Sequence, residues 1–406
     1  MSNKTNKLIP ELRFPEFVEE GEWEEKSFEE LFEIGNGRDY KHLGKGEIPV
    51  YGSGGYMLSV NDYLYDGESV CIGRKGTINK PLFLVGKFWT VDTLFYTHSF
   101  KECSPKYIHY VFQNIDWLKH NEAGGVPSLS KTNIYKIETL IPNPQEQQKI
   151  ASCLSSLDEV IAAHSQKLDT LKDHKKGLMQ NLFPTNSITN DELEITNVPN
   201  YRFTEFLKDG DWVEKKLGEV AELTSSKRVH LADYLPRGIP FYRGKEISQL
   251  KNNNIIEDIL YISEEQYESI KEKYGVPKIG DILITAVGTL GNVYCIKSDE
   301  KFYFKDGNLI WMKNITIDSV FLEVLLDVEK EKVLASAIGS SQKALTMAAL
   351  NKLEFNIPKN PLEQQKIASC LSTLDDLITA QTEKIEQLKL HKKGLMQGLF
   401  PKSITN

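Results

Sequence analysis

The chain has 406 residues, of which 40% are hydrophobic and 26% are charged, and it carries a net charge of −8. This composition is typical of two or three globular domains, excludes a disordered or collagen-like chain, and counts against a simple non-specific nucleic-acid binder. No run approaches the ~20 apolar residues of a membrane helix, and the five cysteines stand far apart without a CxxC pair. We expect no metal site, no disulfide framework and a cytoplasmic location.

The first predicted domain, residues 1–143, is mixed α/β with short strands. Strands are predicted where β-branched and aromatic residues are punctuated by glycine, at residues 48–52, 69–73, 81–85 and 89–96. The apolar spacing that follows predicts a helix over residues 105–120, with Ser104 as its N-cap.

After a linker at residues 185–200, a second domain over residues 201–360 repeats this order. Its strands are predicted at residues 240–243, 281–287, 292–297 and 308–313, and its helix at residues 319–336. Ser263 and Gln266 have the spacing of a capping box, which predicts an extra helix over residues 263–274.

Two pairs of markers indicate that the chain is a tandem duplication. The opening RFPEF…GEW at residues 13–23 returns as RFTEF…GDW at residues 202–212, an offset of 189. Residues 144–184 return at residues 361–401, an offset of 217, and 28 of these 41 positions are identical. The larger second offset means that the second half carries an insertion. We therefore expect two divergent domains and two nearly identical constant segments.

The constant segments, residues 144–184 and 361–401, are predicted to be long coiled-coil helices that pair antiparallel, followed by a tail at residues 402–406. An Asn-Pro pair at each start supplies an N-cap and a first-turn proline, and eight of ten seam positions in each copy are apolar. A polar seam residue either fixes the register or is simply tolerated. The seam residues are Ile150, Leu154, Leu157, Ile161, His164, Leu168, Leu171, Lys175, Leu178 and Leu182, and Ile367, Leu371, Leu374, Ile378, Gln381, Ile385, Leu388, Lys392, Leu395 and Leu399.

Binding features are better represented than catalytic ones. The chain has no G-x-x-x-x-G-K-[ST] phosphate loop and no N-P-P-[YF] methyltransferase loop, so we expect no catalytic residue and no cofactor in it. Residues 36–136 hold twelve basic and nine acidic side chains, and residues 224–251 hold six and two. Basic and amide side chains beside glycine and aromatic residues suit contacts with phosphates and bases. The predicted DNA-binding residues are Arg38, Lys41, Lys45, Arg74, Lys75, Lys227, Arg228, Arg243, Lys245, Gln342 and Lys343.

The repeated segments resemble those of the specificity subunits of type I restriction–modification systems. The resemblance rests on LIPNPQEQQKI at residues 140–150 and its copy within residues 356–375, on the two Arg-Phe openings, and on the KKGLMQ…LFP helix ends. It implies two target recognition domains that each read one half of a bipartite, asymmetric DNA site. It also implies a non-catalytic chain whose paired helices set the spacer and dock two methyltransferase subunits, with restriction subunits joining that core. S-adenosylmethionine, ATP and magnesium would then belong to the partner chains.

Two other interpretations stay open at this point. A coiled-coil scaffold that tethers other proteins explains the heptads but not the basic, glycine-flanked loops in both domains. A recognition subunit of a related methyltransferase or nuclease outside type I explains both features. Nearly identical helices suit two copies of one partner around a pseudo-twofold axis, but recombination between the duplicated segments also keeps helices alike.

Overall fold

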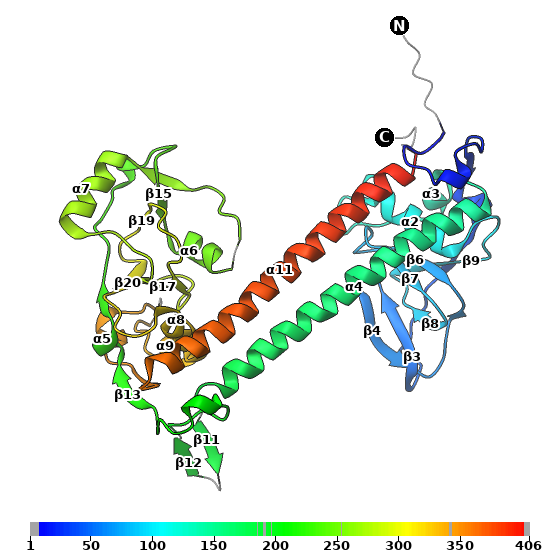
Figure 1. The fold of residues 1–406 in the computed structure, drawn as a ribbon. Helices are drawn as coiled ribbons and strands as arrows, with labels where there is room; N and C mark the ends of the chain where they lie inside the picture. Colours follow the sequence, from blue (N-terminus) through cyan, green and yellow to red (C-terminus); the bar gives the residue numbers. More distant parts are fainter. Residues whose placement is uncertain are drawn as a thin grey trace. The chain divides into compact units, whose positions relative to one another are not determined.

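The computed structural model describes residues 8–184, 186–189, 192–195, 197–252, 254–340 and 343–401. It divides into two compact units, Met1–Gln166 with Glu383–Asn406, and Lys167–Thr382. The two long helices, α4 (Pro144–Asn181) and α11 (Pro361–Leu399), each have one end in either unit (Figure 1). Each unit therefore contains an α/β domain, the beginning of one long helix and the end of the other.

The domain of the first unit contains two four-stranded sheets. One is antiparallel, in the order β2 (Glu33–Asn36), β9 (Leu94–His98), β6 (Ser69–Gly73) and β7 (Leu82–Leu84). The other has the order β4 (Gly55–Val60), β3 (Lys45–Gly52), β8 (Lys87–Thr90) and β5 (Tyr65–Asp66), with β3 and β8 parallel. A further pair, β1 (Glu24–Ser27) and β10 (Glu138–Ile141), accompanies the helices α1 (Phe28–Leu31), α2 (Pro105–Asn114) and α3 (Lys131–Tyr135).

The domain of the second unit has the same plan. Its antiparallel sheet has the order β14 (Glu222–Thr224), β20 (Leu309–Lys313), β17 (Ile282–Thr285) and β18 (Val293–Cys295). Its mixed sheet has the order β16 (Leu260–Ile262), β15 (Ile239–Tyr242) and β19 (Tyr303–Phe304), with β15 and β19 parallel. Two pairs complete the strands, β13 (Val213–Lys216) with β21 (Glu354–Ile357) and β11 (Asn186–Thr189) with β12 (Glu192–Ile195). The helices are α5 (Leu217–Val220), α6 (Gly244–Lys251), α7 (Glu264–Tyr274), α8 (Ser319–Val328), α9 (Lys330–Ala335) and α10 (Met347–Leu350).

The fold class is confirmed, but three predicted elements are wrong in their extent. The strand predicted over residues 89–96 is two strands in different sheets, because a turn after Thr90 separates β8 from β9. The helix predicted over residues 105–120 ends at Asn114, where Ile115 is extended, and Asp116 then caps a separate 3-10 helix. The helix predicted over residues 319–336 divides into α8 and α9 at Glu329.

The long helices follow their predicted starts and end slightly earlier than predicted, at Asn181 and Leu399. All twenty seam positions are buried or half-buried. In the first unit Lys392 Nζ lies 2.6 Å from Asp158 Oδ1, and in the second unit Lys175 Nζ lies 2.5 Å from Asp375 Oδ1. In both units, therefore, the end of one helix pairs with the beginning of the other, and the helices run antiparallel.

The repeated opening and the repeated helix start form the same ion pair in both units. Arg13 donates from Nε and Nη2 to the two oxygens of Glu146, each at 2.8 Å, and Arg202 donates in the same way to Glu363. Both carboxylates are 1% exposed. Identity between the two copies at these positions is therefore explained by internal packing.

The far ends of the helices complete the cores. Phe400, at the end of α11, contacts Trp23 of the first opening with ring centroids 6.5 Å apart. Phe183, after the end of α4, contacts Trp212 of the second opening at 6.0 Å. Each unit thus needs an opening, a helix start and a helix end of the same shape, although the helix end comes from the other repeat.

Candidate nucleic-acid interface

Loops of the first domain meet at one edge of its antiparallel sheet. Strands β2 and β6 end there and β9 begins there, since Gly73 pairs with Leu94. The loop before α3 reaches the same place, because the Leu129 N–H donates to the Arg74 carbonyl at 2.9 Å. We call this surface the first edge, and it consists of residues 36–38, 74–77, 91–93 and 121–131.

Arg74 projects at the centre of the first edge. Two cavities of about 380 and 410 Å³ flank it; one also involves Asp92 and Ser128, and the other Asn36 and Lys131. Its side chain is exposed, and its guanidinium carbon lies 6.0 Å from the centroid of the Phe95 ring.

Lys131 adds a second cation beside the same ring. Its Nζ lies 5.9 Å from the Phe95 centroid and donates to the Ile34 carbonyl at 2.5 Å. Burial, together with the positive charge of Arg74, lowers the pKa of Lys131. The described residues show no ion pair between a carboxylate and either Arg74 or Lys131. The cavity beside Arg74 is also lined by Asp92 and Glu122, but basic side chains outnumber acidic ones in the first edge, which suits a negative ligand.

The first edge collects some of the residues that the sequence predicted to bind DNA and not others. Arg38, Arg74 and Lys75 lie in it and are exposed. Lys41 lies in the loop that connects the first edge to β3. Lys45 begins β3 opposite Val60, seven residues before the end of that strand, so it stands roughly 20 Å away along the strand.

The second domain presents an equivalent surface, the second edge, at residues 225–228, 286–291, 306–308, 337–340 and 343–346. The Ala286 N–H donates to the Asn308 carbonyl at 2.8 Å, and the Leu345 N–H donates to the Ala286 carbonyl at 2.9 Å. Lys343 is exposed on this surface, whereas the predicted Gln342 lies outside the described residues.

Lys227 and Arg228 follow β14 into the second edge. The Lys227 N–H donates to the Tyr303 hydroxyl at 2.6 Å, which anchors the backbone, and its Nζ lies 5.1 Å from the centroid of the Tyr274 ring. Arg228 Nε donates to Asp306 Oδ2 at 2.8 Å, but the Arg228 side chain remains 70% exposed.

Arg243 and Lys245 lie at the start of α6 and differ sharply. The Arg243 guanidinium donates to Glu246, whose side chain is fully enclosed, and this ion pair raises the pKa of Arg243. The Nε and Nη2 donors of Arg243 therefore bind Glu246 and stabilise the start of α6. Lys245 is exposed, and the structure gives it no ion pair among the described residues.

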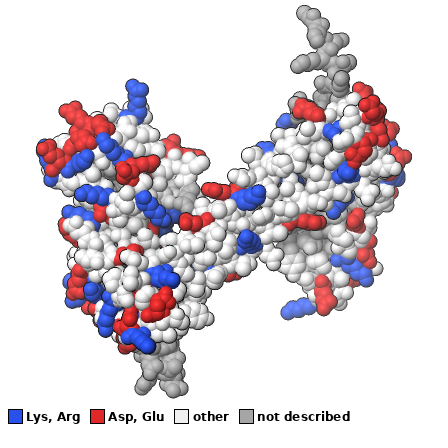
Figure 2. All heavy atoms as spheres, in the orientation of Figure 1, with Lys and Arg blue, Asp and Glu red and all other residues white. Residues whose placement is uncertain are grey.

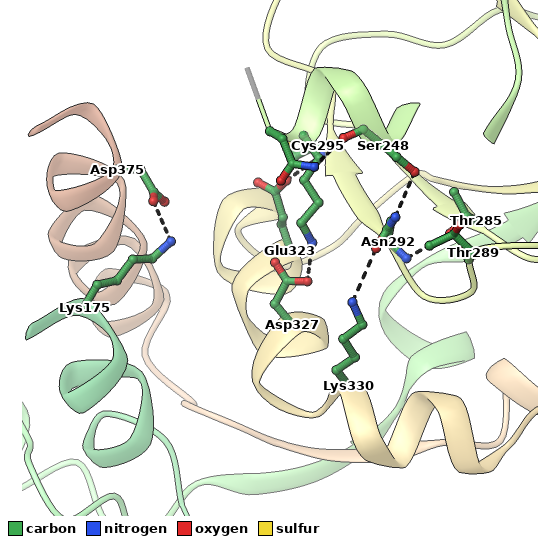
Figure 3. A network of polar contacts seen from close by, with 12 residues as sticks. Lys175, Ser248, Thr285, Thr289, Asn292, Cys295, Glu323, Asp327, Lys330 and Asp375 are labelled. Carbon is green, nitrogen blue, oxygen red and sulfur yellow. Dashed lines mark hydrogen bonds and ion pairs between the residues drawn. The ribbon is translucent and has the colours of Figure 1, made fainter. Parts of the chain in front are cut away.

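A polar network fixes α6 and the loop of the second edge to α8 and α9 (Figure 3). Asn292 donates from Nδ2 to Ser248 Oγ at 2.8 Å and accepts from Lys330 Nζ at 3.3 Å. The Asn292 N–H donates to Thr285 Oγ1 at 2.9 Å, and Lys251 pairs with Asp327 nearby. These bonds connect the loop to α6 and α9, and the Lys251–Asp327 pair connects α6 to α8.

Sequence reasoning missed Asn36, Ser130 and Lys131 in the first edge and Thr289 in the second. Short sequence matches between the two repeats could have identified these residues. Gly-Thr occurs at residues 76–77 and again at 288–289, and Ser-Leu-Ser at 128–130 corresponds to Ala-Leu-Thr at 344–346. An alignment of these short matches predicts that the loops share one edge in each domain.

Charge is mixed on the visible surface. On the face shown in Figure 2, basic and acidic side chains are interspersed, and acidic residues gather over α7 with lysines between them. Among the described residues, no helix is long and apolar enough to cross a membrane, and no group of three His, Cys, Asp or Glu side chains could hold a metal ion.

Two domains of one topology, each with its own polar edge and each built onto a shared helix pair, define a duplicated recognition protein. The family model described as the type I restriction modification DNA specificity domain matches residues 20–173 and 209–390. These matches span most of the sequence, and the chain belongs to this family.

Individual relatives agree with the family match. The chain is 27% identical over 346 residues to a candidate type I restriction enzyme specificity subunit of Haemophilus influenzae, covering 83% of each protein. It is 27% identical over 366 residues to the type I restriction enzyme MjaVIII specificity subunit of Methanocaldococcus jannaschii, covering 85% of this chain and 79% of that one.

A solved structure has the same fold. The type I restriction–modification S subunit from M. genitalium matches with a TM-score of 0.67 at 16% identity, over 97% of this chain and all of that one. This chain is accordingly a DNA specificity subunit of a type I restriction–modification system.

Proposed function

We propose that each domain reads one half of a bipartite, asymmetric DNA site through its own edge, and that the helix pair sets the spacer between the halves. The observation that carries this proposal is the pair of equivalent edges with unlike side chains. Equivalent backbones present Arg74 and Lys75 in one domain and Ala286 and Val287 in the other. One fold with two different surfaces suits two different half-sites.

Arg38, Arg74, Lys75 and Lys131 are the proposed DNA contacts of the first edge. Those of the second edge are Lys227, Arg228 and Lys343, with Gln342 retained from the sequence, and Lys245 is a further proposed contact at the start of α6. Lys41 and Lys45 are left as phosphate contacts outside the edge. The basic residues of both edges supply the attraction that the net charge of −8 lacks.

The helices support a second part of the proposal, docking of two copies of one methyltransferase subunit. Identity at buried positions such as Glu146 and Glu363 is explained by internal contacts. The positions that are identical and exposed in both copies, apart from the terminal prolines and the Lys149–Glu16 and Lys366–Glu205 pairs, form what we call the outward set. It consists of Gln148, Ser152, Ala163, Lys167, Lys172, His174, Lys176 and Gln180, and of Gln365, Ser369, Ala380, Lys384, Lys389, His391, Lys393 and Gln397.

Among the described contacts, the outward set has no internal contact that is shared by both copies: Lys389 pairs with Glu386 at 2.8 Å, but no such pair is described for Lys172. Two equal partners require two equal surfaces. We therefore assign adenine methylation with S-adenosylmethionine to the docked subunits. ATP- and magnesium-dependent cleavage is assigned to restriction subunits that join them. The specificity chain itself is proposed to recognise DNA without performing chemistry.

The recognition proposal is tested by single-molecule methylome sequencing of cells with and without this gene. We expect one bipartite, asymmetric adenine-methylation motif to vanish on deletion. An unchanged set of motifs, while the gene and a methyltransferase partner are both expressed, contradicts the proposal.

The docking proposal is tested by the stoichiometry of the purified complex. Lys172→Glu with Lys176→Glu reverses charge on α4 only, and Lys389→Glu with Lys393→Glu does so on α11 only. Each double variant should lower the bound methyltransferase from two copies to one, as measured by native mass spectrometry. Lys208→Glu with Lys215→Glu is the matched control, because these lysines are exposed outside the helices. Two copies retained in both helix variants contradicts docking on the outward set.

A further inference from the structure

We propose that Arg74 reads a guanine in the half-site of the first domain, and that the second domain reads no guanine from the equivalent position. This inference rests on the proposed function and extends it to the identity of a base. It is carried by three observations: the availability of the Arg74 guanidinium, its place between two cavities, and the residue at the equivalent position of the duplicated domain.

Most arginine side chains of this chain already form ion pairs with carboxylates. The chain has seven arginines, all within the described residues. Four of them, Arg13, Arg202, Arg228 and Arg243, form ion pairs with carboxylates. The other three are Arg38, Arg74 and Arg237, and Arg237, which precedes β15, is not among the residues of the second edge. Only Arg38 and Arg74 therefore combine a position on an edge with a guanidinium that no carboxylate holds in the described structure.

Arg74 is also oriented. Its guanidinium lies over the Phe95 ring, and its Nη1 faces the Asp92 carbonyl at 3.5 Å, so the side chain is directed without being neutralised. The Arg74 side chain lies between the two flanking cavities of about 380 and 410 Å³. A planar guanidinium in such a position can donate two parallel hydrogen bonds to O6 and N7 of guanine in the major groove.

The duplicated domain distinguishes a base contact from a phosphate contact. Arg74 and Ala286 are equivalent: the N–H of each donates across the sheet at 2.8 Å, to Thr93 and Asn308, and the carbonyl of each accepts from a leucine at 2.9 Å. Gly76 and Gly288, two residues later, both have positive φ, +91° and +82°.

Phosphates are the same in every half-site, so a difference between two half-sites does not itself require a phosphate-binding residue to change. A base-reading residue must differ when the half-sites differ. The replacement of an exposed arginine by an alanine that is 2% exposed is therefore the change expected of a base reader. The second loop instead exposes Gly288 and Thr289, which cannot make the paired donation that guanine needs.

The test uses the full chain in complex with its methyltransferase partner and compares wild type, Arg74→Ala, Arg74→Lys and Lys101→Ala. Binding is measured to duplexes in which each base pair of the methylation motif is replaced in turn. We expect the wild-type complex to prefer guanine at one position of one half-site by roughly 5- to 150-fold. Both Arg74 variants should lose most of this preference and keep the preferences in the other half-site. Lys101→Ala, an exposed residue beyond the far end of β9, should keep all of them.

Three results overturn the inference. The first is an unchanged preference at every position in Arg74→Ala, and the second is relaxation at a position that is not a G·C pair. The third is a uniform loss of affinity that Arg74→Lys restores, with a salt dependence smaller by about one charge, which identifies a phosphate contact. In all three cases the wild-type complex still has a bipartite motif, so the proposed function stands. A wild-type complex without such a motif overturns the proposed function and this inference together.

Discussion

The two domains are most alike where they join the helices and least alike at their edges. The Arg–Glu pairs of the two units have the same hydrogen-bond lengths, and a phenylalanine from a helix end packs on a tryptophan in both. At the edges, by contrast, equivalent backbone positions hold Arg74 and Ala286. Selection for one helix platform and for two different surfaces therefore acts on separate parts of the same fold. Small differences inside the shared platform make this comparison testable.

The largest expected effect is loss of a buried carboxylate. Glu146→Ala should destabilise the first unit by about 3–5 kcal/mol, because it leaves Arg13 buried without a counter-ion. Glu363→Ala should cost the second unit about 1 kcal/mol more, since Glu363 also accepts from Trp212 Nε1 at 3.2 Å, a bond that Trp23 lacks. Urea-dependent hydrogen exchange of β10 and β21 measures the two units separately.

The control for this experiment is Lys149→Ala, which removes an exposed pair with Glu16 and should change stability by less than about 1 kcal/mol. Equal losses in Glu146→Ala and Glu363→Ala contradict the role assigned to Trp212. A loss no larger than that of the control contradicts the buried-pair argument as a whole.

The second prediction concerns opposite responses to acid. His109 and Glu323 are equivalent, because α2 and α8 are anchored alike: the Ser104 N–H donates to Gln147 at 3.0 Å and the Asp318 N–H to Gln364 at 3.1 Å. Burial lowers the pKa of His109 from 6.5 to about 4, whereas burial raises the pKa of Glu323. The equivalent helix position thus holds an imidazole in the first unit and a carboxyl group in the second, and burial favours the neutral form of each.

The stability that His109 contributes is present above about pH 6.5 and is lost as the pH falls toward 4, by up to about 3 kcal/mol, because the unfolded chain binds the proton more readily. Glu323 has the opposite sign, since its raised pKa favours the folded state at low pH and this contribution is lost as the pH rises through that pKa. Pulse proteolysis in urea between pH 4.5 and 7.5, with fragments assigned to each unit, follows both effects. His109→Gln and Glu323→Gln should each remove one of them, and parallel pH profiles in the two unmodified units contradict the prediction.

The third prediction separates the loops of the two edges. Asn292→Ala removes the bonds to Ser248 and Lys330 and should destabilise the loop by about 1–2 kcal/mol, broadening base preference in the second half-site only. Asn79, at the corresponding end of the first loop, is exposed, and Asn79→Ala is the matched control. Binding to duplexes with single substitutions reports both. Broadening in the first half-site by Asn292→Ala is the outcome that rejects a local role.

Local signals explain which parts of this fold could be predicted. The starts of α4 and α11 could be predicted from the sequence because Asn143 and Asn360 cap these helices through their own side chains, at 2.9 and 3.0 Å. The helix α7 could be predicted for the same reason, since Ser263 is its N-cap. The parallel pairs β3–β8 and β15–β19 join segments far apart in the chain, and no local pattern encodes them.

The grouping of the candidate site residues in space could not be predicted for the same reason. The sequence marks Arg74 and Arg243 as equal candidates, since both are arginines beside glycine and aromatic residues. Only the packing of α6 shows that Glu246 takes up the donors of Arg243. Likewise, Lys131 joins Arg74 only through the approach of two loops about fifty residues apart.

The smallest expected effect lies in the seam of the helix pair. Lys392 pairs with Asp158, donates to Gln113 at 3.0 Å and lies 5.1 Å from the centroid of the Tyr110 ring, whereas its counterpart Lys175 has the Asp375 pair alone among the described contacts. Lys392→Ala should therefore destabilise the first unit by about 1 kcal/mol, and Lys175→Ala the second by a few tenths, since the pairs are partly exposed to solvent. Double-mutant cycles with Asp158→Ala and Asp375→Ala isolate the two coupling energies in urea unfolding. Equal losses in the single variants Lys392→Ala and Lys175→Ala would mean that the aromatic ring and the amide add nothing, and that the seam, unlike the edges, is the same in both copies.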